Sequence, residues 1–202
     1  MEKMSNAARR RLVFLANFLS RYENDRVTSK AIQEATGFSS DVVRKDFSRL
    51  GLGGGFSNGY DAKKLLGAIR AELGLPQTER RCCIAGLGTL GEAVMRCGIF
   101  DGTLYKIVAG FDFRVNRTEV LNADFPLYPA NKIESVVSRM EIEFAVLAVE
   151  NEYARAMAER LIKSGVRGIV NFTNEAIAES ENVFVENVSL VLALDNLCAR
   201  MK

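Results

Sequence analysis

The sequence has 202 residues, of which 48% are hydrophobic and 26% charged, and its formal net charge is +2. This composition is typical of a soluble globular protein of one to two domains. The absence of histidine excludes Ser-His-Asp and Cys-His catalysis and most catalytic zinc sites, so we expect no catalytic residues and no metal site. No run of about 18 apolar residues and no signal-peptide core occurs, so we expect a cytoplasmic protein without membrane contact.

Charge is divided unevenly along the chain. Residues 1–80 carry 14 lysines and arginines against 9 acidic residues, whereas residues 81–202 carry 13 against 16. A basic first part joined to a mildly acidic second part favours nucleic-acid binding at the N-terminal end. The polar segment 72–80, which contains Gly74 and Pro76, is the expected boundary between the two parts.

The first part is predicted to begin with two helices. Apolar residues at helical spacing indicate an amphipathic first helix: Leu12, Phe14, Leu15, Phe18 and Leu19. Thr28 and Ser29 are the expected N-caps for a short helix over residues 30–36, in which Ile32 and Ala35 face inward. Gly37 is expected to end that helix, because glycine tolerates the left-handed backbone of a tight turn.

The next helix is the expected DNA-reading element. Val43, Phe47 and Leu50 form its buried stripe, which leaves hydroxyl and basic side chains on its outer face. Two helices joined by a short turn with glycine are typical of a helix-turn-helix, whose second helix enters the major groove. The predicted DNA contacts on this helix and its N-cap are Ser39, Ser40, Arg44, Lys45 and Ser48.

A glycine-rich segment follows, with five glycines in residues 51–60. It lacks the Gly-Lys-Ser/Thr ending of a phosphate-binding P-loop. Beside a recognition helix it predicts a hairpin wing against the DNA backbone, with Ser57 and Asn58 as further DNA contacts. A small helical domain for packing or dimerisation remains the alternative to DNA binding for this part of the chain.

The second part opens on an apolar strand over residues 81–85, followed directly by a glycine-rich turn and a helix start. Gly86, Gly88 and Gly91 have the Gly-x-Gly-x-x-Gly spacing, which allows a tight turn, close approach to a pyrophosphate and close packing of helix on strand. The N–H groups at the helix start would face the phosphates. The predicted dinucleotide-binding loop is Gly86, Leu87, Gly88, Thr89, Leu90 and Gly91.

The four cysteines are expected to be buried, reduced thiols. No Cys-x-x-Cys motif occurs in the sequence. Cys82 and Cys83 are adjacent in a predicted strand and point to opposite faces, so they cannot share a metal ion. The other two are Cys97 and Cys198.

A carboxylate ends the next predicted strand, over residues 106–111. Asp112 follows Gly88 by 24 residues, where dinucleotide folds place the acid that binds the adenosine ribose hydroxyls. A 2′-phosphate would meet this carboxylate as a like charge. Asp112 therefore favours NAD(H) over NADP(H).

Two further apolar strands, 144–149 and 166–172, alternate with helical segments over 133–140 and 153–164. Such alternation predicts an α/β domain with a parallel sheet and crossover helices. Residues at the ends of these strands complete the predicted cofactor site: Ala148, Val149, Asn171 and Phe172.

About 120 residues suffice for a dinucleotide fold but leave no room for a substrate domain. We therefore expect NAD(H) to act as a sensed ligand and not as a reagent. Two alternatives remain, a nicotinamide-dependent oxidoreductase with an accessory helical domain and a regulator that senses another nucleotide, such as coenzyme A.

Motifs over nearly the whole chain resemble the Rex family, the NADH-responsive transcriptional repressors of bacteria. Residues 43–48 resemble the family's recognition helix, residues 53–60 its wing and residues 86–91 its NAD loop. The segments 165–172 and 185–188 resemble its C-terminal signature, which is long and specific.

The resemblance implies an N-terminal winged helix-turn-helix domain over residues 1–78, a Rossmann domain over 79–184 and a domain-swapped C-terminal helix over 185–202. It also implies a homodimer that binds a palindromic operator and leaves it when NADH is high. The C-terminal segment is too apolar to lie exposed, which agrees with burial in a partner. Its apolar residues are Val185, Val188, Leu190, Val191, Leu192, Leu194 and Leu197.

The chain departs from the family at four positions. By alignment along the motifs, Phe56 stands where the wing usually carries a basic residue. The family's redox switch uses an arginine on the first helix, a tyrosine after the glycine loop and a C-terminal aspartate. Those places hold Asn17, Cys97 and Ser189. The resemblance therefore leaves the electrostatic part of the switch in question.

Overall fold

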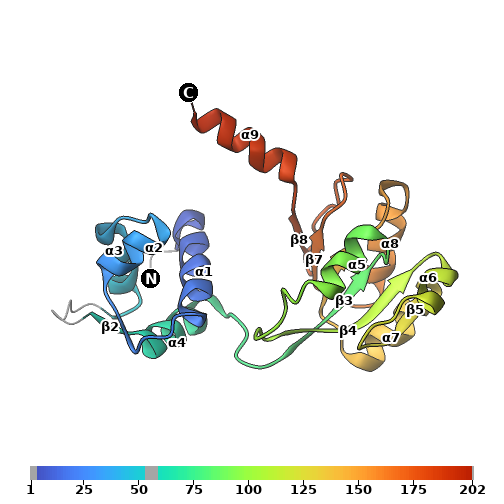
Figure 1. Cartoon of the computed structure of the whole chain (residues 1–202), viewed down its shortest axis with the longest axis horizontal. Coiled ribbons are helices and arrows are strands. Elements are labelled where there is room, and N and C mark those ends of the chain that lie inside the picture. The colour runs from blue at the N-terminus through green and yellow to red at the C-terminus, as the bar shows by residue number, and fades with distance from the viewer. Residues whose placement is uncertain (1–3, 53–58, 202) are drawn as a thin grey trace. The chain divides into compact units, whose positions relative to one another are not determined.

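The computed structural model describes residues 4–52 and 59–201, and the chain divides into two compact units, Met1–Gln77 and Thr78–Lys202 (Figure 1). Among the described residues, no helix is long and apolar enough to cross a membrane. No group of three or more potential metal-ligating side chains gathers in the described ranges either.

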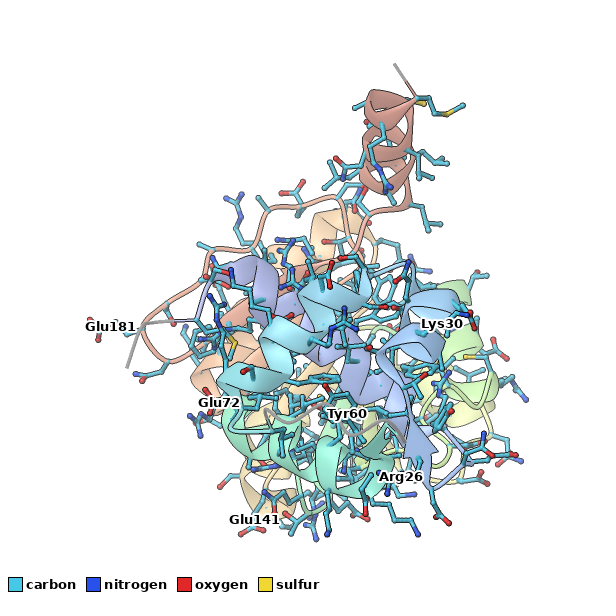
Figure 2. The ribbon with its side chains drawn as sticks, turned by 90° about the vertical axis from the view of Figure 1, so that its left-hand side faces the viewer. Arg26, Lys30, Tyr60, Glu72, Glu141 and Glu181 are labelled. Carbon is cyan, nitrogen blue, oxygen red and sulfur yellow. The ribbon has the colours of Figure 1, made fainter. Side chains whose placement is uncertain are left out.

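The first unit is helical, with one small two-stranded ladder. Its elements are α1 (Asn6–Ser20), β1 (Arg26–Val27), α2 (Ser29–Thr36), α3 (Ser40–Arg49), β2 (Tyr60–Asp61) and α4 (Ala62–Leu73). The strands β1 and β2 pair antiparallel, and Figure 2 shows Arg26 on β1 and Tyr60 on β2. The Tyr60 ring packs edge-on against Phe47 of α3, with 4.9 Å between the ring centroids. The ladder thus anchors the chain beside α3.

Short polar caps define these helices. Ser5, Thr28, Ser39 and Asp61 each accept a hydrogen bond from a backbone N–H in the first turn of their helix, which confirms Thr28 as a cap. Gly37 ends α2 with a φ of 76°, as expected for a left-handed turn. The largest fully buried side chains of this unit come from α1, α2, α3 and α4: Leu12, Leu15, Ile32, Phe47, Leu65 and Ile69.

One inward-facing residue was predicted wrongly. Ala35 is exposed, because it lies at the edge of a surface groove that α1 lines with Phe14 and Phe18. Ile32 is the only described residue of α2 that is fully in the core.

The second unit is built on a six-stranded parallel sheet, in the order β5-β4-β3-β6-β7-β8. Its strands are β3 (Arg80–Ala85), β4 (Tyr105–Asp112), β5 (Leu127–Pro129), β6 (Phe144–Leu147), β7 (Gly168–Asn171) and β8 (Phe184–Asn187). Its helices are α5 (Thr89–Arg96), α6 (Val115–Val120), the 3₁₀ turn η1 (Ala130–Lys132), α7 (Ile133–Met140), α8 (Asn151–Lys163) and α9 (Leu190–Arg200). The predicted parallel α/β domain is confirmed.

Helices cover both faces of this sheet (Figure 1). Cys83 and Ala85 of β3 face a core formed with α7 and α8, whereas Ile84 faces a smaller cluster formed with α5. The strand order reverses at β3, which pairs with β4 on one side and β6 on the other. Ligands of open α/β sheets bind at the carboxyl ends of the strands beside such a reversal. The Gly-rich loop leaves β3 at this end.

The C-terminal segment differs from the prediction of a helix over 185–202. Val185 lies in β8, paired in parallel with Ile169 of β7. The helix α9 starts only after Ser189, whose side chain accepts a hydrogen bond from the N–H of Leu192. Residues 184–187 form an edge strand whose backbone groups pair with those of β7. If these residues were helical, the backbone groups on that side of β7 would have no partner from this segment. Every described residue of α9 is exposed.

The prediction of four buried thiols is wrong for two of them. Cys82 and Cys83 are buried in β3, and burial, with a smaller effect of Glu143, raises the pKa of Cys82 to about 12. Cys97 is exposed because it follows the last residue of α5, and Cys198 is exposed because it lies on α9.

Candidate functional site

The loop between β3 and α5 requires glycine at two positions. Gly86 has a φ of 105°, and a Cβ there would lie 2.4 Å from the carbonyl oxygen of Ala148. A Cβ on Gly91 would lie 1.8 Å from the carbonyl oxygen of Gly86. Gly88 is the N-cap of α5 and makes no side-chain cap. The loop therefore packs tightly against the backbone around it and leads directly into the N-terminus of α5. A pyrophosphate site requires both features.

Asp112 holds this loop in place. Its side chain is almost completely buried at the end of β4. Its Oδ2 accepts a 2.7 Å hydrogen bond from the N–H of Leu87, and its Oδ1 accepts one of 2.7 Å from the N–H of Arg114. Asp112 thus supports the loop from below, a structural task that the sequence pattern does not reveal. Its contact with a ribose stays a prediction.

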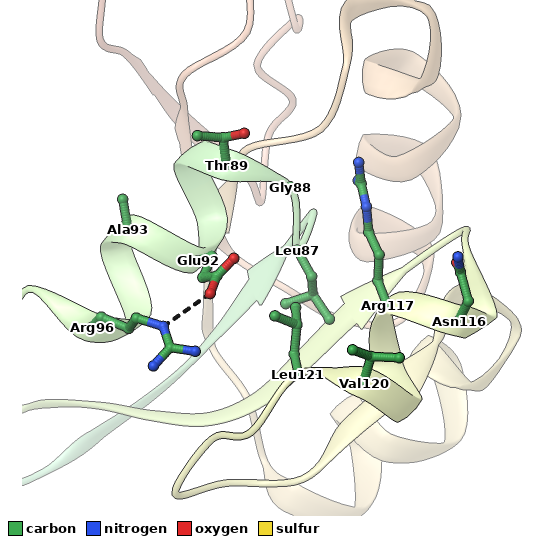
Figure 3. A pocket seen from close by; sticks show the side chains of 10 residues that line it. All are labelled: Leu87, Gly88, Thr89, Glu92, Ala93, Arg96, Asn116, Arg117, Val120 and Leu121. Atoms are coloured by element: carbon green, nitrogen blue, oxygen red, sulfur yellow. Dashed lines mark hydrogen bonds and ion pairs between the residues drawn. The ribbon is translucent and has the colours of Figure 1, made fainter.

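Two arginines and a second carboxylate lie above the loop. Arg117 of α6 contacts Asp112 (Nη1 to Oδ2, 3.4 Å) and Glu150 (Nη2 to Oε1, 3.2 Å). Arg114 contacts the same Glu150 oxygen from Nη2 at 3.4 Å. These contacts join the ends of β4 and β6 across the carboxyl edge of the sheet. The adjoining cavity of about 600 Å³ is lined by Leu87, Gly88, Thr89, Glu92, Ala93, Arg96, Asn116, Arg117, Val120 and Leu121 (Figure 3).

The charges of this cluster stabilise one another. Partial desolvation lowers the pKa of Arg117, but the charges of Asp112 and Glu150 outweigh it and raise that pKa above its ordinary value. The pKa of Glu150 lies below its ordinary value, because a backbone hydrogen bond and then Arg117 and Arg114 outweigh its desolvation. Both shifts favour the charged forms of Arg117 and Glu150, which form an ion pair.

The other predicted cofactor residues lie at the same edge of the sheet, in different settings. Ala148 is fixed by a hydrogen bond from its N–H to Ala85, and Val149 packs against the core. Asn171 is fully buried, and its amide donates to Asn187 and to the carbonyl of Glu175. Phe172 packs against the cluster under α5. The buried side chain of Asn171 thus secures the ends of β7 and β8.

Replacing Asp112 by alanine is expected to lower the free energy of unfolding of the second unit by about 2–4 kcal/mol. The change strands the N–H groups of Leu87 and Arg114, and each buried donor without a partner costs about 1–3 kcal/mol. Urea unfolding followed by circular dichroism measures the loss. The exposed Asp124→Ala variant is the matched control, and equal stability of the two variants would contradict the supporting role.

The helix α3 presents the predicted DNA contacts on its outer side. Arg44, Lys45 and Ser48 are exposed, whereas Val43 and Phe47 are fully buried. The guanidinium of Arg44 is paired with Asp41 and donates to Ser29 Oγ. These contacts are exposed and therefore contribute little to stability.

The serines at the start of α3 organise the turn. Ser39 caps α3, and Ser40 Oγ donates to Gln33 of α2 at 2.7 Å. The predicted DNA contacts Ser57 and Asn58, and the wing residue Phe56, lie outside the described residues.

An ion pair that the sequence pattern does not predict fixes the buried side of α3 to α1. Arg11 of α1 contacts both carboxylate oxygens of Asp46, with Nε to Oδ2 at 2.8 Å and Nη2 to Oδ1 at 3.0 Å. Asp46 is buried among the apolar residues of α3. A bidentate pair of this geometry sets the orientation of α3 against α1.

Two family models match the chain. The model described as CoA binding domain matches residues 77–175, and the model described as putative DNA-binding protein N-terminus matches residues 3–48. A curated relative from Ligilactobacillus salivarius, named redox-sensing transcriptional repressor Rex, is 30% identical over 198 residues, covering 96% of this chain and 92% of the relative. A relative of the same name from Pediococcus pentosaceus is 32% identical and covers 98% of this chain and 97% of its own. The chain belongs to the Rex family.

Solved structures of a Rex-family repressor called RSP share the fold of this Rex protein. The free repressor has a TM-score of 0.81 at 24% identity, covering 100% of this chain and 95% of its own. The structure titled as RSP with NAD⁺ and operator DNA has a TM-score of 0.82 at 24% identity, covering 100% and 94%. This likeness confirms the predicted fold, an N-terminal helical domain joined to a Rossmann-like domain.

Proposed function

We propose that this Rex family member is a transcriptional repressor that binds a palindromic DNA operator and is released when NADH occupies its second unit. The observation that carries the proposal is the presence, in one chain, of a helix α3 with exposed basic side chains on its outer face and a tight glycine loop at the start of α5. The names of the relatives support it, as does a structure of RSP titled as a complex with NADH.

Each part of the chain has a proposed task. DNA binding belongs to residues 1–78, through Ser39, Ser40, Arg44, Lys45, Ser48, Ser57 and Asn58. NAD(H) binding belongs to residues 79–184, through the loop 86–91 with Asp112, Ala148, Val149, Asn171 and Phe172. Dimerisation belongs to the segment 185–202, through exposed leucines of α9 that a second copy of the chain would cover. Exchange of α9 between two cytoplasmic protomers fits an exposed C-terminal helix.

NAD(H) acts in this proposal as a signal and not as a reagent. The carboxyl edge of the sheet offers arginines and carboxylates that are already paired with one another, and no separate substrate domain. An oxidoreductase is the second candidate, supported by the glycine loop alone. Oxidation of NADH by a panel of carbonyl substrates, followed by absorbance, would favour the oxidoreductase.

Calorimetric titration of nucleotide-free protein with NADH, NAD⁺ and coenzyme A tests the choice of ligand. We expect saturable binding of NADH and weaker binding of coenzyme A. Tight binding of coenzyme A without binding of NADH would replace the proposal by a sensor of another nucleotide.

The preference for NADH over NAD⁺ is expected to be weaker than in typical family members. The redox states differ by one positive charge on the nicotinamide ring, and discrimination needs a charge that responds to it. Asn17, Cys97 and Ser189 at the switch positions carry no such charge, and Ser189 is engaged as the cap of α9. The ratio of the two dissociation constants measures the preference. If NAD⁺ bound about a thousandfold more weakly than NADH, other residues would carry the switch.

A further inference from the structure

Arg114 and Arg117 converge on one carboxylate oxygen. Both guanidinium groups contact Oε1 of Glu150, at 3.4 and 3.2 Å. Arg114 is the second residue after the end of β4, and Arg117 lies on α6. Glu150 follows β6 and is the N-cap of α8. The charged residues that follow β4 and β6, the strands on either side of β3, therefore meet at one place. Such a pair of arginines is a site for an anion, and in this structure the anion is Glu150.

This point lies at the adenosine end of the proposed nucleotide site. In dinucleotide folds the acid at the end of the second strand contacts the ribose 2′-hydroxyl, and an arginine close to it accommodates a 2′-phosphate where the cofactor carries one. Asp112 is that acid, and Arg117 contacts it at 3.4 Å. Arg114 donates its backbone N–H to the other oxygen of Asp112. Both arginines thus stand where a 2′-phosphate would be held.

Asp112 alone is a weak barrier against a 2′-phosphate. Both of its oxygens already accept backbone hydrogen bonds, and its charge is opposed by Arg117. The charges of Asp112 and Arg117 balance each other. The positive charge of Arg114 is then offset, among the described contacts, only by Glu150. Without the charge of Glu150 the cluster would attract an added phosphate.

We propose that Glu150 sets the preference for a cofactor without a 2′-phosphate, by occupying the anion site that Arg114 and Arg117 form. The inference rests on the proposed binding of NAD(H) to this edge of the sheet. A phosphate entering the site must displace the Glu150 carboxylate from both arginines and then lie beside it as a like charge. NADH carries only an uncharged hydroxyl at that position, so it does not have to displace the Glu150 carboxylate, and the three ion pairs stay intact.

The test compares the dissociation constants of NADH and NADPH for the full chain, the E150Q variant and the E152Q variant. Glu152 is exposed on the first turn of α8, so its change removes the same charge two residues away. We expect E150Q to lower the ratio of the NADPH to the NADH constant by about tenfold or more, because a phosphate gains charge-assisted hydrogen bonds from two freed arginines. E152Q should leave the ratio within about twofold, since screening weakens distant surface charges.

A second variant separates the arginine site from a general change of charge. R114Q in the E150Q background keeps the backbone N–H that supports Asp112 and removes one arginine, so it should cancel most of the gain in NADPH affinity. Circular dichroism of each variant checks that the fold is kept. An unchanged ratio in E150Q, an equal gain in E152Q or a gain that survives R114Q would overturn the inference. Failure of the wild type to bind either nucleotide would instead overturn the proposed function, and with it this inference.

Discussion

Replacing Arg44 and Lys45 together by alanine is expected to weaken operator binding at least about a hundredfold. Both side chains point outward from α3, so they are free to reach DNA once it displaces the exposed contact of Arg44 with Asp41. A bidentate contact with a base discriminates by about 1–3 kcal/mol, and each phosphate contact adds counterion release. Because a dimer uses the helix twice, the losses in the two half-sites combine.

The fold should survive this double change. The inner side of α3 keeps Val43 and Phe47 in the core and Asp46 on Arg11, and alanine is the best helix former at the two changed positions. Fluorescence anisotropy with DNA selected by the wild type from a random pool measures affinity, and circular dichroism reports folding. K132A/K163A removes two exposed positive charges from the second unit as a control. Equal affinity of the double variant and the wild type would contradict the assignment of α3.

Replacing Leu194 by aspartate is expected to convert the proposed dimer into a monomer. Leu190, Leu194 and Leu197 lie at positions i, i+4 and i+7 of α9 and are 81%, 60% and 52% exposed in the single chain. An apolar stripe of this kind needs a partner, and a buried unpaired carboxylate at its centre would cost several kcal/mol in each copy. The loss of paired half-sites should then weaken DNA binding as well.

Light scattering coupled to size exclusion gives the outcome directly. We expect the wild type at twice the 22.3 kDa of one chain and the L194D variant at 22.3 kDa. N196D adds the same charge on the opposite side of α9 and should remain dimeric. A dimeric L194D variant would show that α9 is not the main contact between copies.

The sequence predicts those parts of the molecule that local chemistry determines. The glycines at 86 and 91 mark a turn between strand and helix because the backbone around them leaves no space for a side chain, and this constraint is visible as a spacing. Thr28, Ser39 and Gly37 begin and end helices through hydrogen bonds to residues only a few positions away. Such features are local, and the structure has them where the sequence places them.

The sequence does not predict contacts between segments that are far apart in the chain. Glu150 meets Arg114 and Arg117 only after β4 and β6 have been placed on either side of β3, and no spacing connects them. Arg11 and Asp46 meet across 35 positions for the same reason. The apolar residues from Val185 onward continue into α9 and therefore predict one helix over 185–202. Pairing with β7 makes residues 184–187 a strand instead.

In the proposed function, one chain couples a nucleotide site to DNA release. The most direct test is the anisotropy of labelled selected DNA bound to wild-type protein, titrated with NADH at fixed salt and repeated with NAD⁺. We predict that NADH releases the DNA, that NAD⁺ does so only at higher concentration, and that E152Q behaves as the wild type. DNA that stays bound when calorimetry shows the protein saturated with NADH would contradict the claim.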